Sequence, residues 1–568
     1  MLLSDRIVQL LEELGVHYIF GVPGSTTVSL ITSISGSDQI KFISSLNENV
    51  SLAMADGYAR TSGKIGVVLL HTTPGLATAL PNLYNAYVDH VPLLILVGDV
   101  NSKFLIKEPG LSLDGIENLA KPLSEWSYYA KSTSDVLIAI KRTAGIFSSP
   151  GAGPCCIVIP EDLMEVNLSD RNRSSSSLPT EPIIMNPDLQ EIRLLVSTID
   201  HAKWPVLIVG REIKSDSAVK ALVEFCNLFA VPVLLESPYP SAYAVGFPQN
   251  DPCYMGLFRR EAESLKQSDL VIGLGGQLVT ERKYYEEDPF DSTTKIIHIS
   301  SDIWQLGKNV RTDSSIAADP EKTAQMLCAI SKEIEPNRIN LDSRRSKMAI
   351  LQLTRKKEME NLLSKRGEYN GIKPWRLIHA LKESLRNENY IIVDEGVVAS
   401  SYLSELFVFT IPGSLVGRSA GCLGWGVGAA IGAKLACPEK KVIAFVGDGA
   451  LMFSPQGIWS AAHYKIPILI IVCNNSGYSS VGLSLDSYSR RTNKKVNNNG
   501  IVIEEPRLEI SKLGQSLGAD SVSINSEKEL LPAIKKAISS KTVFLLDVKT
   551  DPSERGYENS IGNNSAWT

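Results

Sequence analysis

The chain has 568 residues, of which 44% are hydrophobic and 21% are charged, and its formal net charge at pH 7 is -5. This length is too great for a single hydrophobic core and predicts roughly three to four domains. The near-average composition and small net charge argue against a nucleic-acid-binding surface. These quantities alone indicate a soluble globular protein and nothing more specific.

No targeting or membrane segment is predicted. The amino terminus lacks the basic start and the uninterrupted apolar core of a signal peptide. Apolar runs such as Val442–Val446 are too short to cross a bilayer. Eight cysteines occur without CxxC pairs, which favours reduced, mostly buried thiols over disulfides or zinc sites. We therefore expect a cytoplasmic protein without a membrane partner.

The first third of the chain alternates predicted strands and helices. After a helix at Ser4–Leu14, the predicted strands are Tyr18–Gly21, Gly66–His71, Leu93–Gly98 and Cys156–Pro160. Each run is short and apolar and is followed by glycine, proline or polar residues, as is typical of strands buried in a parallel sheet. The Ser-rich segment 169–185 is typical of a linker, so the first predicted domain spans residues 1–168.

Two further α/β units are predicted. The second spans 186–342, with strands at Pro205–Gly210, Pro232–Glu236, Leu270–Gly275 and Lys295–Ile299, and a charged helical linker covers 343–370. The third spans 371–551, with strands at Tyr390–Asp394, Lys441–Gly447, Ile466–Asn474 and Val543–Val548, before a polar tail at 552–568 that we expect to fray. The predicted fold is α/β, with three doubly wound parallel-sheet domains.

The third unit carries a candidate metal and phosphate site. Gly447-Asp448-Gly449-Ala450 ends one predicted strand, and Asn475-Ser476-Gly477-Tyr478 ends the next. The spacer between them holds one helix and one strand, so both segments should lie at neighbouring strand ends. Asp448, Asn475 and the Gly477 carbonyl offer the oxygen ligands that Mg²⁺ prefers, and the adjacent helix amino terminus favours a diphosphate. Either segment alone would be better interpreted as an ordinary turn.

These paired segments resemble the signature of the thiamine diphosphate-dependent 2-oxo acid decarboxylase and acetolactate synthase superfamily, and the resemblance covers essentially the whole chain. It implies a pyrimidine-binding domain, a central Rossmann-like domain and a diphosphate-binding domain, in that order. It also implies thiamine diphosphate and Mg²⁺ as cofactors. The implied metal ligands are Asp448, Asn475 and Gly477, and the other cofactor-binding residues of this motif are Gly447, Gly449, Ala450 and Tyr478.

The resemblance assigns three more residues to the cofactor. Glu48, just before Ala55-Asp56-Gly57-Tyr58-Ala59, matches the family's glutamate that hydrogen-bonds the pyrimidine ring. Leu423 matches the wedge beneath the bent cofactor, and the Gly421 carbonyl should contact the pyrimidine amino group. The alternatives are a solvent-facing glutamate and a core leucine. Family members share their sites between subunits, so a homodimer or homotetramer is implied.

Within the superfamily, several segments resemble benzoylformate decarboxylase most. Ser25 matches its active-site serine and His71 its first active-site histidine, although Ser25 could instead cap a helix and His71 could be purely structural. The implied activity is non-oxidative decarboxylation of a 2-oxo acid through ylid and enamine intermediates. The second histidine of that enzyme has no counterpart in Gly273–Tyr284, which leaves open what replaces it.

The alternative is an acetolactate synthase-like carboligase. Arg60–Lys64 and Lys295–Ile299 resemble that branch, but Glu108–Leu113 lacks its glutamine. FAD would belong to this alternative, and the middle domain shows no convincing flavin signature to support it. Gly273-Leu274-Gly275-Gly276 also misses the GxGxxG pattern of dinucleotide sites. Ser484–Glu504 is predicted to be a loop that closes over the site, and nothing in its composition identifies the 2-oxo acid.

Overall fold

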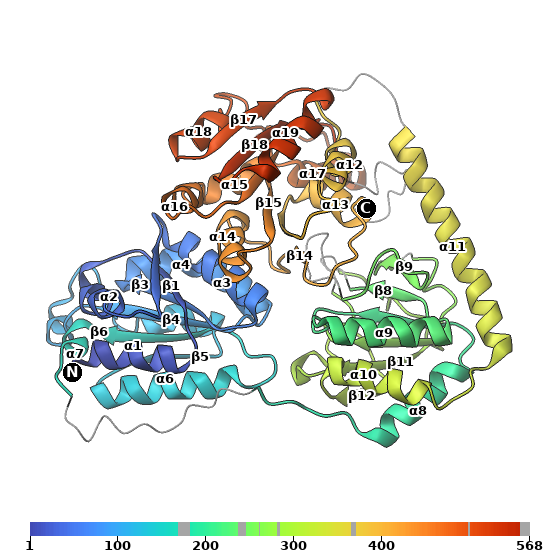
Figure 1. Cartoon of the computed structure of the whole chain (residues 1–568), viewed down its shortest axis with the longest axis horizontal. Coiled ribbons are helices and arrows are strands. Elements are labelled where there is room, and N and C mark those ends of the chain that lie inside the picture. The colour runs from blue at the N-terminus through green and yellow to red at the C-terminus, as the bar shows by residue number, and fades with distance from the viewer. Residues whose placement is uncertain are drawn as a thin grey trace.

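The computed structural model describes residues 1–168, 182–236, 246–260, 262–280, 284–364, 371–497 and 500–556. These residues form three lobes, and each lobe is built on a six-stranded sheet with helices packed against it (Figure 1). All strand pairs in the three sheets are parallel, which confirms the predicted fold class. The central strands are nearly continuous apolar runs, because helices cover both faces of such sheets, whereas several strands at the edges carry polar residues.

The first lobe contains the sheet β2-β1-β3-β4-β6-β5. Its strands are β1 (Tyr18–Gly21), β2 (Lys41–Ser44), β3 (Gly66–His71), β4 (Leu93–Asp99), β5 (Trp126–Tyr129) and β6 (Cys155–Pro160). The longer helices are α1 (Leu3–Glu13), α2 (Val28–Ser35), α3 (Glu48–Ser62), α4 (Thr72–Val88) and α6 (Thr133–Phe147). Helices α3 and α4 follow strands β2 and β3, so both begin at the carboxyl edge of the sheet.

The middle lobe contains the sheet β12-β11-β10-β7-β8-β9. Its strands are β7 (Pro205–Val209), β8 (Val233–Leu235), β9 (Tyr254–Leu257), β10 (Leu270–Leu274), β11 (Lys295–Ser300) and β12 (Ser314–Ala317). Its helices are α8 (Leu189–His201), α9 (Asp216–Phe229) and α10 (Pro320–Ser331). The long helix α11 (Arg338–Ser364) leaves this lobe along its outer side and leads towards the third (Figure 1).

The third lobe contains the sheet β14-β13-β15-β16-β18-β17. Its strands are β13 (Tyr390–Glu395), β14 (Leu415–Val416), β15 (Lys441–Gly447), β16 (Leu469–Asn474), β17 (Asp520–Ile524) and β18 (Phe544–Lys549). Its helices are α12 (Pro374–Ser384), α13 (Val398–Leu406), α14 (Gly426–Ala436), α15 (Asp448–Phe453), α16 (Gly457–His463), α17 (Ser479–Thr492), α18 (Ile510–Ser516) and α19 (Glu527–Ser539).

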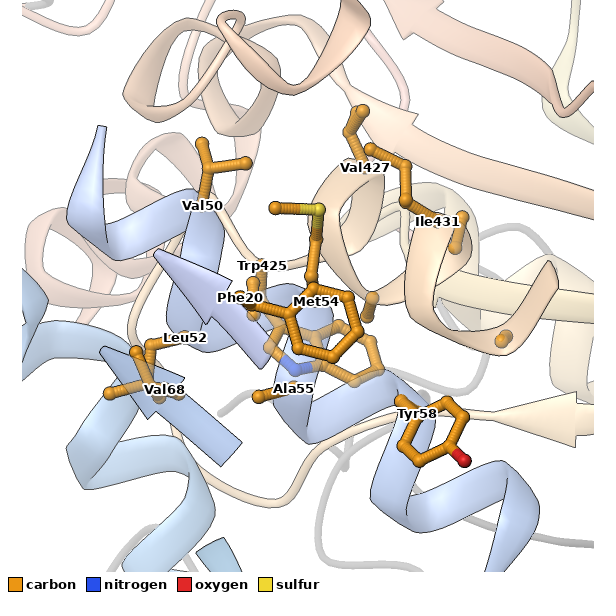
Figure 2. Packing of buried hydrophobic residues seen from close by; sticks show 14 of the residues in the cluster. Phe20, Val50, Leu52, Met54, Ala55, Tyr58, Val68, Trp425, Val427 and Ile431 are labelled. Atoms are coloured by element: carbon orange, nitrogen blue, oxygen red, sulfur yellow. The ribbon is translucent and has the colours of Figure 1, made fainter. Parts of the chain in front are cut away.

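The first and third lobes share one hydrophobic core through helices α3 and α14. Buried side chains from both lobes meet there, among them Met54, Trp425 and Ile431 (Figure 2). The two helices approach closely because glycines face the opposite backbone. A Cβ on Gly432 would overlap the Met54 carbonyl, and a Cβ on Gly57 would overlap Ala429. This packing fixes the orientation of the first lobe relative to the third.

Two segments differ from the predictions made from composition. The segment predicted to be a loop at Ser484–Glu504 begins inside helix α17, which extends to Thr492 and packs through the buried Leu483. Residues 552–556, the start of the tail that is predicted to fray, are instead held in place. Glu554 pairs with Lys373, and Arg555 lies 3.1 Å from Asp486. Most of the predicted linker 169–185, residues 365–370 and the rest of the tail lie outside the described residues.

The cysteines and the helices bear on the expectations of reduced thiols and of no membrane segment. All eight cysteines are free, and each is buried or half-buried. Among the described helices, none combines the length and the apolar character needed to cross a membrane.

Candidate active site

A cavity opens at the carboxyl ends of β13, β15 and β16, with about 880 Å³ of empty space including its mouth. Its position is the usual ligand site of an open parallel sheet, outside the carboxyl ends of the strands. All of its described lining residues come from positions 374–554 of the third lobe. They include every predicted residue of the two strand-end segments and of the wedge loop: Gly421, Leu423, Gly447, Asp448, Gly449, Ala450, Asn475, Gly477 and Tyr478.

The two strand-end segments meet as the sequence predicts. Asp448 is the first residue of α15, and its Oδ1 accepts a hydrogen bond from the Gly449 N–H at 2.9 Å. The Gly477 N–H lies 3.2 Å from Asp448 Oδ2 and 3.1 Å from Asn475 Oδ1. The Asp448 carboxylate follows β15 and the Asn475 amide oxygen follows β16. The two therefore lie side by side, because both contact the same backbone N–H.

The chemistry of this donor set fits a hard divalent cation. Asp448 is 2% exposed, and its burial raises the pKa of the carboxyl to about 6. A buried carboxylate without a cation to balance its charge is costly, whereas Mg²⁺ would stabilise the ionised form. Asn475 and the Gly477 carbonyl add neutral oxygen donors, so the residues present suit Mg²⁺ shared with a diphosphate.

The backbone around these ligands is rigid on both sides. A Cβ on Gly449 would lie 2.6 Å from the Tyr478 ring, so only glycine permits this packing. Ile501 accepts a hydrogen bond from the Tyr478 N–H at 2.8 Å, and the Ile503 N–H donates to the Ser476 carbonyl at 2.8 Å. This short pairing by residues 501–503 holds the Asn475–Tyr478 loop in place. Sequence inspection did not identify it, because the contact joins two irregular segments.

The loop that carries Gly421 and Leu423 is anchored by a buried ion pair. Arg418, which lines the cavity, places Nη2 3.0 Å from Glu395 Oε1, and both side chains are almost fully buried. Glu395 also accepts hydrogen bonds from the Trp425 and Gly426 N–H groups, at 3.1 Å and 2.7 Å from Oε2. The carboxylate thus caps the amino terminus of α14 while it holds the loop.

A second acidic group, Glu554, also lines the cavity. Its carboxylate pairs with Lys373 and accepts a hydrogen bond from the Tyr402 hydroxyl at 2.5 Å. Sequence inspection missed both Glu554 and Arg418. A charged residue within the Gly-rich stretch from Gly413 to Gly426 was an available signal for Arg418, whereas the region after residue 551 gave none for Glu554.

The remaining predicted residues lie at the carboxyl edge of the first sheet. His71 ends β3 and is half-buried, and its Nδ1 lies 2.8 Å from Thr26 Oγ1. Glu48 begins α3 and lies over the first turn of α4, where a Cβ on Gly75 would be 3.5 Å from Glu48 Oε1. Ser25 is exposed at the start of a 3₁₀ turn, and its hydroxyl has no hydrogen-bond partner among the described residues.

The structure does not bring the two sets of residues into one cavity within the chain. Ser25, Glu48 and His71 belong to the first lobe, whereas the described lining of the cavity around Asp448 comes only from the third. Within the described residues of one chain, Ser25, Glu48 and His71 are therefore separate from the cavity.

The middle lobe does not fit a flavin dinucleotide. A second cavity lies between it and the first lobe, at the carboxyl edge of the middle sheet. The donors at the end of β11 are already used there, because Glu212 accepts from the Ser301 N–H at 2.9 Å and from the Ser300 hydroxyl at 2.7 Å. Arg211 is likewise paired with Asp89 at 3.0 Å. A pyrophosphate would meet the Glu212 carboxylate, so no step is assigned to FAD.

Comparisons with known proteins agree with this architecture. Three family profiles match in order: the N-terminal binding domain of thiamine pyrophosphate enzymes over residues 1–109, their central domain over 192–327, and their C-terminal binding domain over 399–548. The chain belongs to the thiamine pyrophosphate enzymes. The resemblance noted in the sequence is thereby confirmed, and thiamine diphosphate is the cofactor of this family's binding domains.

Proteins similar to this thiamine pyrophosphate enzyme include acetolactate synthase large subunits by sequence and decarboxylases of known structure by fold. The acetolactate synthase large subunit of Haemophilus influenzae is 26% identical over 98% of the chain and 96% of its own length. That of Lactococcus lactis is 26% identical over 97% and 93%. Among solved structures, the 4-hydroxybenzoylformate decarboxylase of Rhodococcus jostii RHA1 has a TM-score of 0.84 at 23% identity, covering 98% of this chain and 100% of its own. The benzoylformate decarboxylase of Polynucleobacter necessarius has a TM-score of 0.82 at 22% identity, covering 98% and 100%.

Proposed function

We propose that the protein catalyses the thiamine diphosphate- and Mg²⁺-dependent, non-oxidative decarboxylation of a 2-oxo acid. The observation that carries the proposal is the buried Asp448 carboxylate beside the Asn475 amide oxygen, at adjacent strand ends and next to the loop that presents Leu423. At the edge of the first sheet, His71 adds a group that can transfer protons. The free Ser25 hydroxyl adds a hydrogen-bond donor for the substrate carboxylate.

Each residue then has a defined role. Asp448, Asn475 and the Gly477 carbonyl would hold the cation, which anchors the diphosphate. Bound thiamine diphosphate supplies a carbon nucleophile and an electron sink for the departing carboxylate. Glu48 would hydrogen-bond the cofactor's pyrimidine ring, and the Gly421 carbonyl and Leu423 would contact the cofactor from the cavity. Ser25 would orient the substrate carboxylate, and His71 would move protons at the reacting carbon.

The proposed assembly is a homodimer, or a homotetramer made of two such dimers. It follows from the separation of the two sets of residues, since the described cavity contains no first-lobe residue that could contact a pyrimidine ring. A second copy would present Glu48 and His71 to the cavity around Asp448. The partner is thus another copy of the chain, and the other ligand is a small 2-oxo acid.

The test is a substrate panel that contains benzoylformate, branched 2-oxo acids and pyruvate, assayed for carbon dioxide and aldehyde with cofactor and Mg²⁺ supplied. We expect turnover of at least one acid, and loss of that turnover in Asp448→Ala and Glu48→Gln. A panel without any turnover by correctly folded, cofactor-loaded protein would contradict the proposal.

A second candidate function is carboligation. The sequence relatives that cover nearly the whole chain are acetolactate synthase large subunits, which supports it. It predicts acetolactate when pyruvate is the only substrate. Aldehyde as the sole product from every accepted acid would exclude it.

A further inference from the structure

Thr26 lies directly behind His71, between that side chain and the end of β4. Its hydroxyl is 2.8 Å from His71 Nδ1 and 2.8 Å from the carbonyl oxygen of Gly98. Thr26 itself is buried, with 3% of its surface exposed. The three groups form a short chain of hydrogen bonds from the imidazole ring to the backbone of the neighbouring strand.

The directions of these two hydrogen bonds follow from the chemistry of the groups. A backbone carbonyl oxygen only accepts, so both contacts can be hydrogen bonds at once only if the Thr26 hydroxyl donates its single proton to Gly98. The hydroxyl oxygen can then only accept from His71, which means that Nδ1 carries the hydrogen. In the neutral ring the other nitrogen, Nε2, is left with a lone pair, and the described residues offer it no partner.

We propose that Thr26 is a positioning residue that holds His71 in the Nδ1–H tautomer, so that Nε2 is the atom that takes up and returns protons. The assignment of proton transfer to His71 rests on the proposed function; the tautomer does not. The Nδ1–H bond to Thr26 is kept whether the ring is neutral or protonated. When Nε2 gives its proton to the substrate carbon that has lost carbon dioxide, the ring becomes neutral, and a proton from water restores it.

The surrounding backbone fixes the ring as well as the hydroxyl. A Cβ on Gly24 would fall within 2.6 Å of His71 Nδ1, so the Gly24 backbone packs directly against the imidazole. The turn that carries Thr26 is closed by Thr27, whose hydroxyl donates to the Gly24 carbonyl at 2.9 Å. Thr26 therefore has little freedom to turn away from the ring. This arrangement resembles the orientation of a catalytic histidine by a third group, with a hydroxyl in place of a carboxylate.

The tautomer can be measured without an activity assay. Full-length protein labelled with ¹⁵N-histidine is studied by solid-state NMR at pH 8, and the His71 signals are assigned by their loss in His71→Asn. We expect a protonated Nδ1 and an unprotonated Nε2 in the wild type and in Thr26→Ser, which keeps the hydroxyl. In Thr26→Val the hydroxyl is replaced by a methyl group of similar size, and we expect the Nε2–H tautomer to appear. An unchanged Nδ1–H tautomer in Thr26→Val would overturn the proposal.

The consequence for turnover is measured on the 2-oxo acid that the substrate panel identifies. We expect Thr26→Val to lower kcat about tenfold to a hundredfold with little change in KM. Thr26→Ser should keep most of the wild-type kcat, because it keeps the hydroxyl. Thr143→Val is the matched control, because it also removes a buried first-lobe hydroxyl that donates to a backbone carbonyl, at 2.8 Å from Ile140. Thr143→Val should leave kcat and the His71 signals unchanged.

The two experiments separate the possible failures. If the wild type shows the Nδ1–H tautomer but no 2-oxo acid is turned over, the proposed function fails and the role of Thr26 in fixing the ring stands. If turnover is found, two results would show that Thr26 does not position His71 for proton transfer. One is an unchanged kcat in Thr26→Val, and the other is a kcat that falls as far in Thr26→Ser as in Thr26→Val.

Discussion

Several acidic side chains near the cavity are fully buried, and Asp394 shows what burial does to one of them. It precedes Glu395, the last residue of β13, which pairs with Arg418. Its Oδ1 accepts from the Ser400 hydroxyl at 2.6 Å and from the Gly396 N–H at 2.9 Å, whereas Oδ2 has no hydrogen-bond partner within the described part of the chain. Loss of water around the carboxyl raises its pKa to about 7. The folded protein therefore holds a proton on Asp394 more tightly than the unfolded chain does.

This linkage predicts how stability depends on pH. The contribution of Asp394 is fully present below its ordinary pKa of 3.8 and is lost as the pH rises towards 7. Asp394→Asn imitates the protonated acid, so it should match the wild type at or below about pH 3.8 and become increasingly more stable than the wild type as the pH rises towards 7. The difference should grow by at most about 1.4 kcal/mol per pH unit. Thermal midpoints of both proteins from pH 5 to 8 provide the measurement, and a variant less stable than the wild type at pH 8 would refute it.

The loop between Arg418 and Trp425 has no regular structure, yet it must present Gly421 and Leu423 at a fixed place. The buried pair of Glu395 and Arg418 supplies this order by joining β13, the loop and the start of α14. A buried carboxylate with three partners is costly to replace, because the arginine is left without a counter-charge.

We therefore expect Glu395→Gln to lower stability by about 2 to 4 kcal/mol and to weaken thiamine diphosphate binding. Glu509→Gln is the control in the same lobe, since Glu509 is exposed and pairs with Lys512 only at the surface, where an ion pair contributes little to stability. Denaturant unfolding and cofactor titration by calorimetry measure the two effects. Equal losses in both variants would mean that the buried pair has no special role.

The packing of helix α3 against helix α14 depends on close contact between their backbones. Because a Cβ on Gly432 would overlap the Met54 carbonyl, Gly432→Ala must push the two helices apart. We expect the free energy of unfolding to fall by about 1 to 3 kcal/mol, which would appear as a lower thermal midpoint. Gly36→Ala is the control, since its Cβ would lie 3.4 Å from the Ser33 carbonyl oxygen and its φ of -85° suits alanine. A tolerated Gly432→Ala would show that the helices can move without cost.

At the scale of the whole molecule, the predicted first-lobe residues and the cavity lie on different lobes of one chain. Glu48 and His71 lie at the edge of the first sheet, and Asp448 lines a cavity whose described residues belong to the third lobe. If a second copy completes the site, each active site takes residues from two chains. Damage to one half in one chain can then be compensated by the intact half in its partner.

This arrangement predicts complementation between inactive variants. Glu48→Gln and Asp448→Ala should each be inactive alone. When they are unfolded together and refolded as a mixture, mixed dimers carry one doubly damaged site and one intact site. Equal amounts should therefore recover about a quarter of the wild-type activity. The activity of mixed and separately refolded samples is the measurement. A mixture that stays inactive while mixed dimers are shown to form would mean that each site belongs to one chain.

Much of this fold and part of the site were predictable from the sequence. Short apolar runs that alternate with helical segments specify buried parallel strands, and the carboxyl ends of such strands meet at one edge. That is why Asp448 and Asn475 could be placed together from their spacing. The helix from Ser479 to Thr492 was missed because its polar composition concealed a weak helical pattern.

The remaining features depend on contacts between residues that are distant in the chain and have no periodic pattern. Thr26 reaches His71 across 45 positions, and Glu554 returns to Lys373 across 181. Hydrogen bonds and ion pairs of this kind depend on where lobes and loops pack, which local propensity does not specify. The sequence by itself predicted the family, the buried central strands of each domain and the metal ligands to expect, with Glu48 in the first domain and Asp448 in the third. Only the tertiary structure decided the strand order, the contact of Thr26 with Nδ1 of His71, and that the described lining of the cavity around Asp448 includes no first-lobe residue, because these features depend on how distant segments pack.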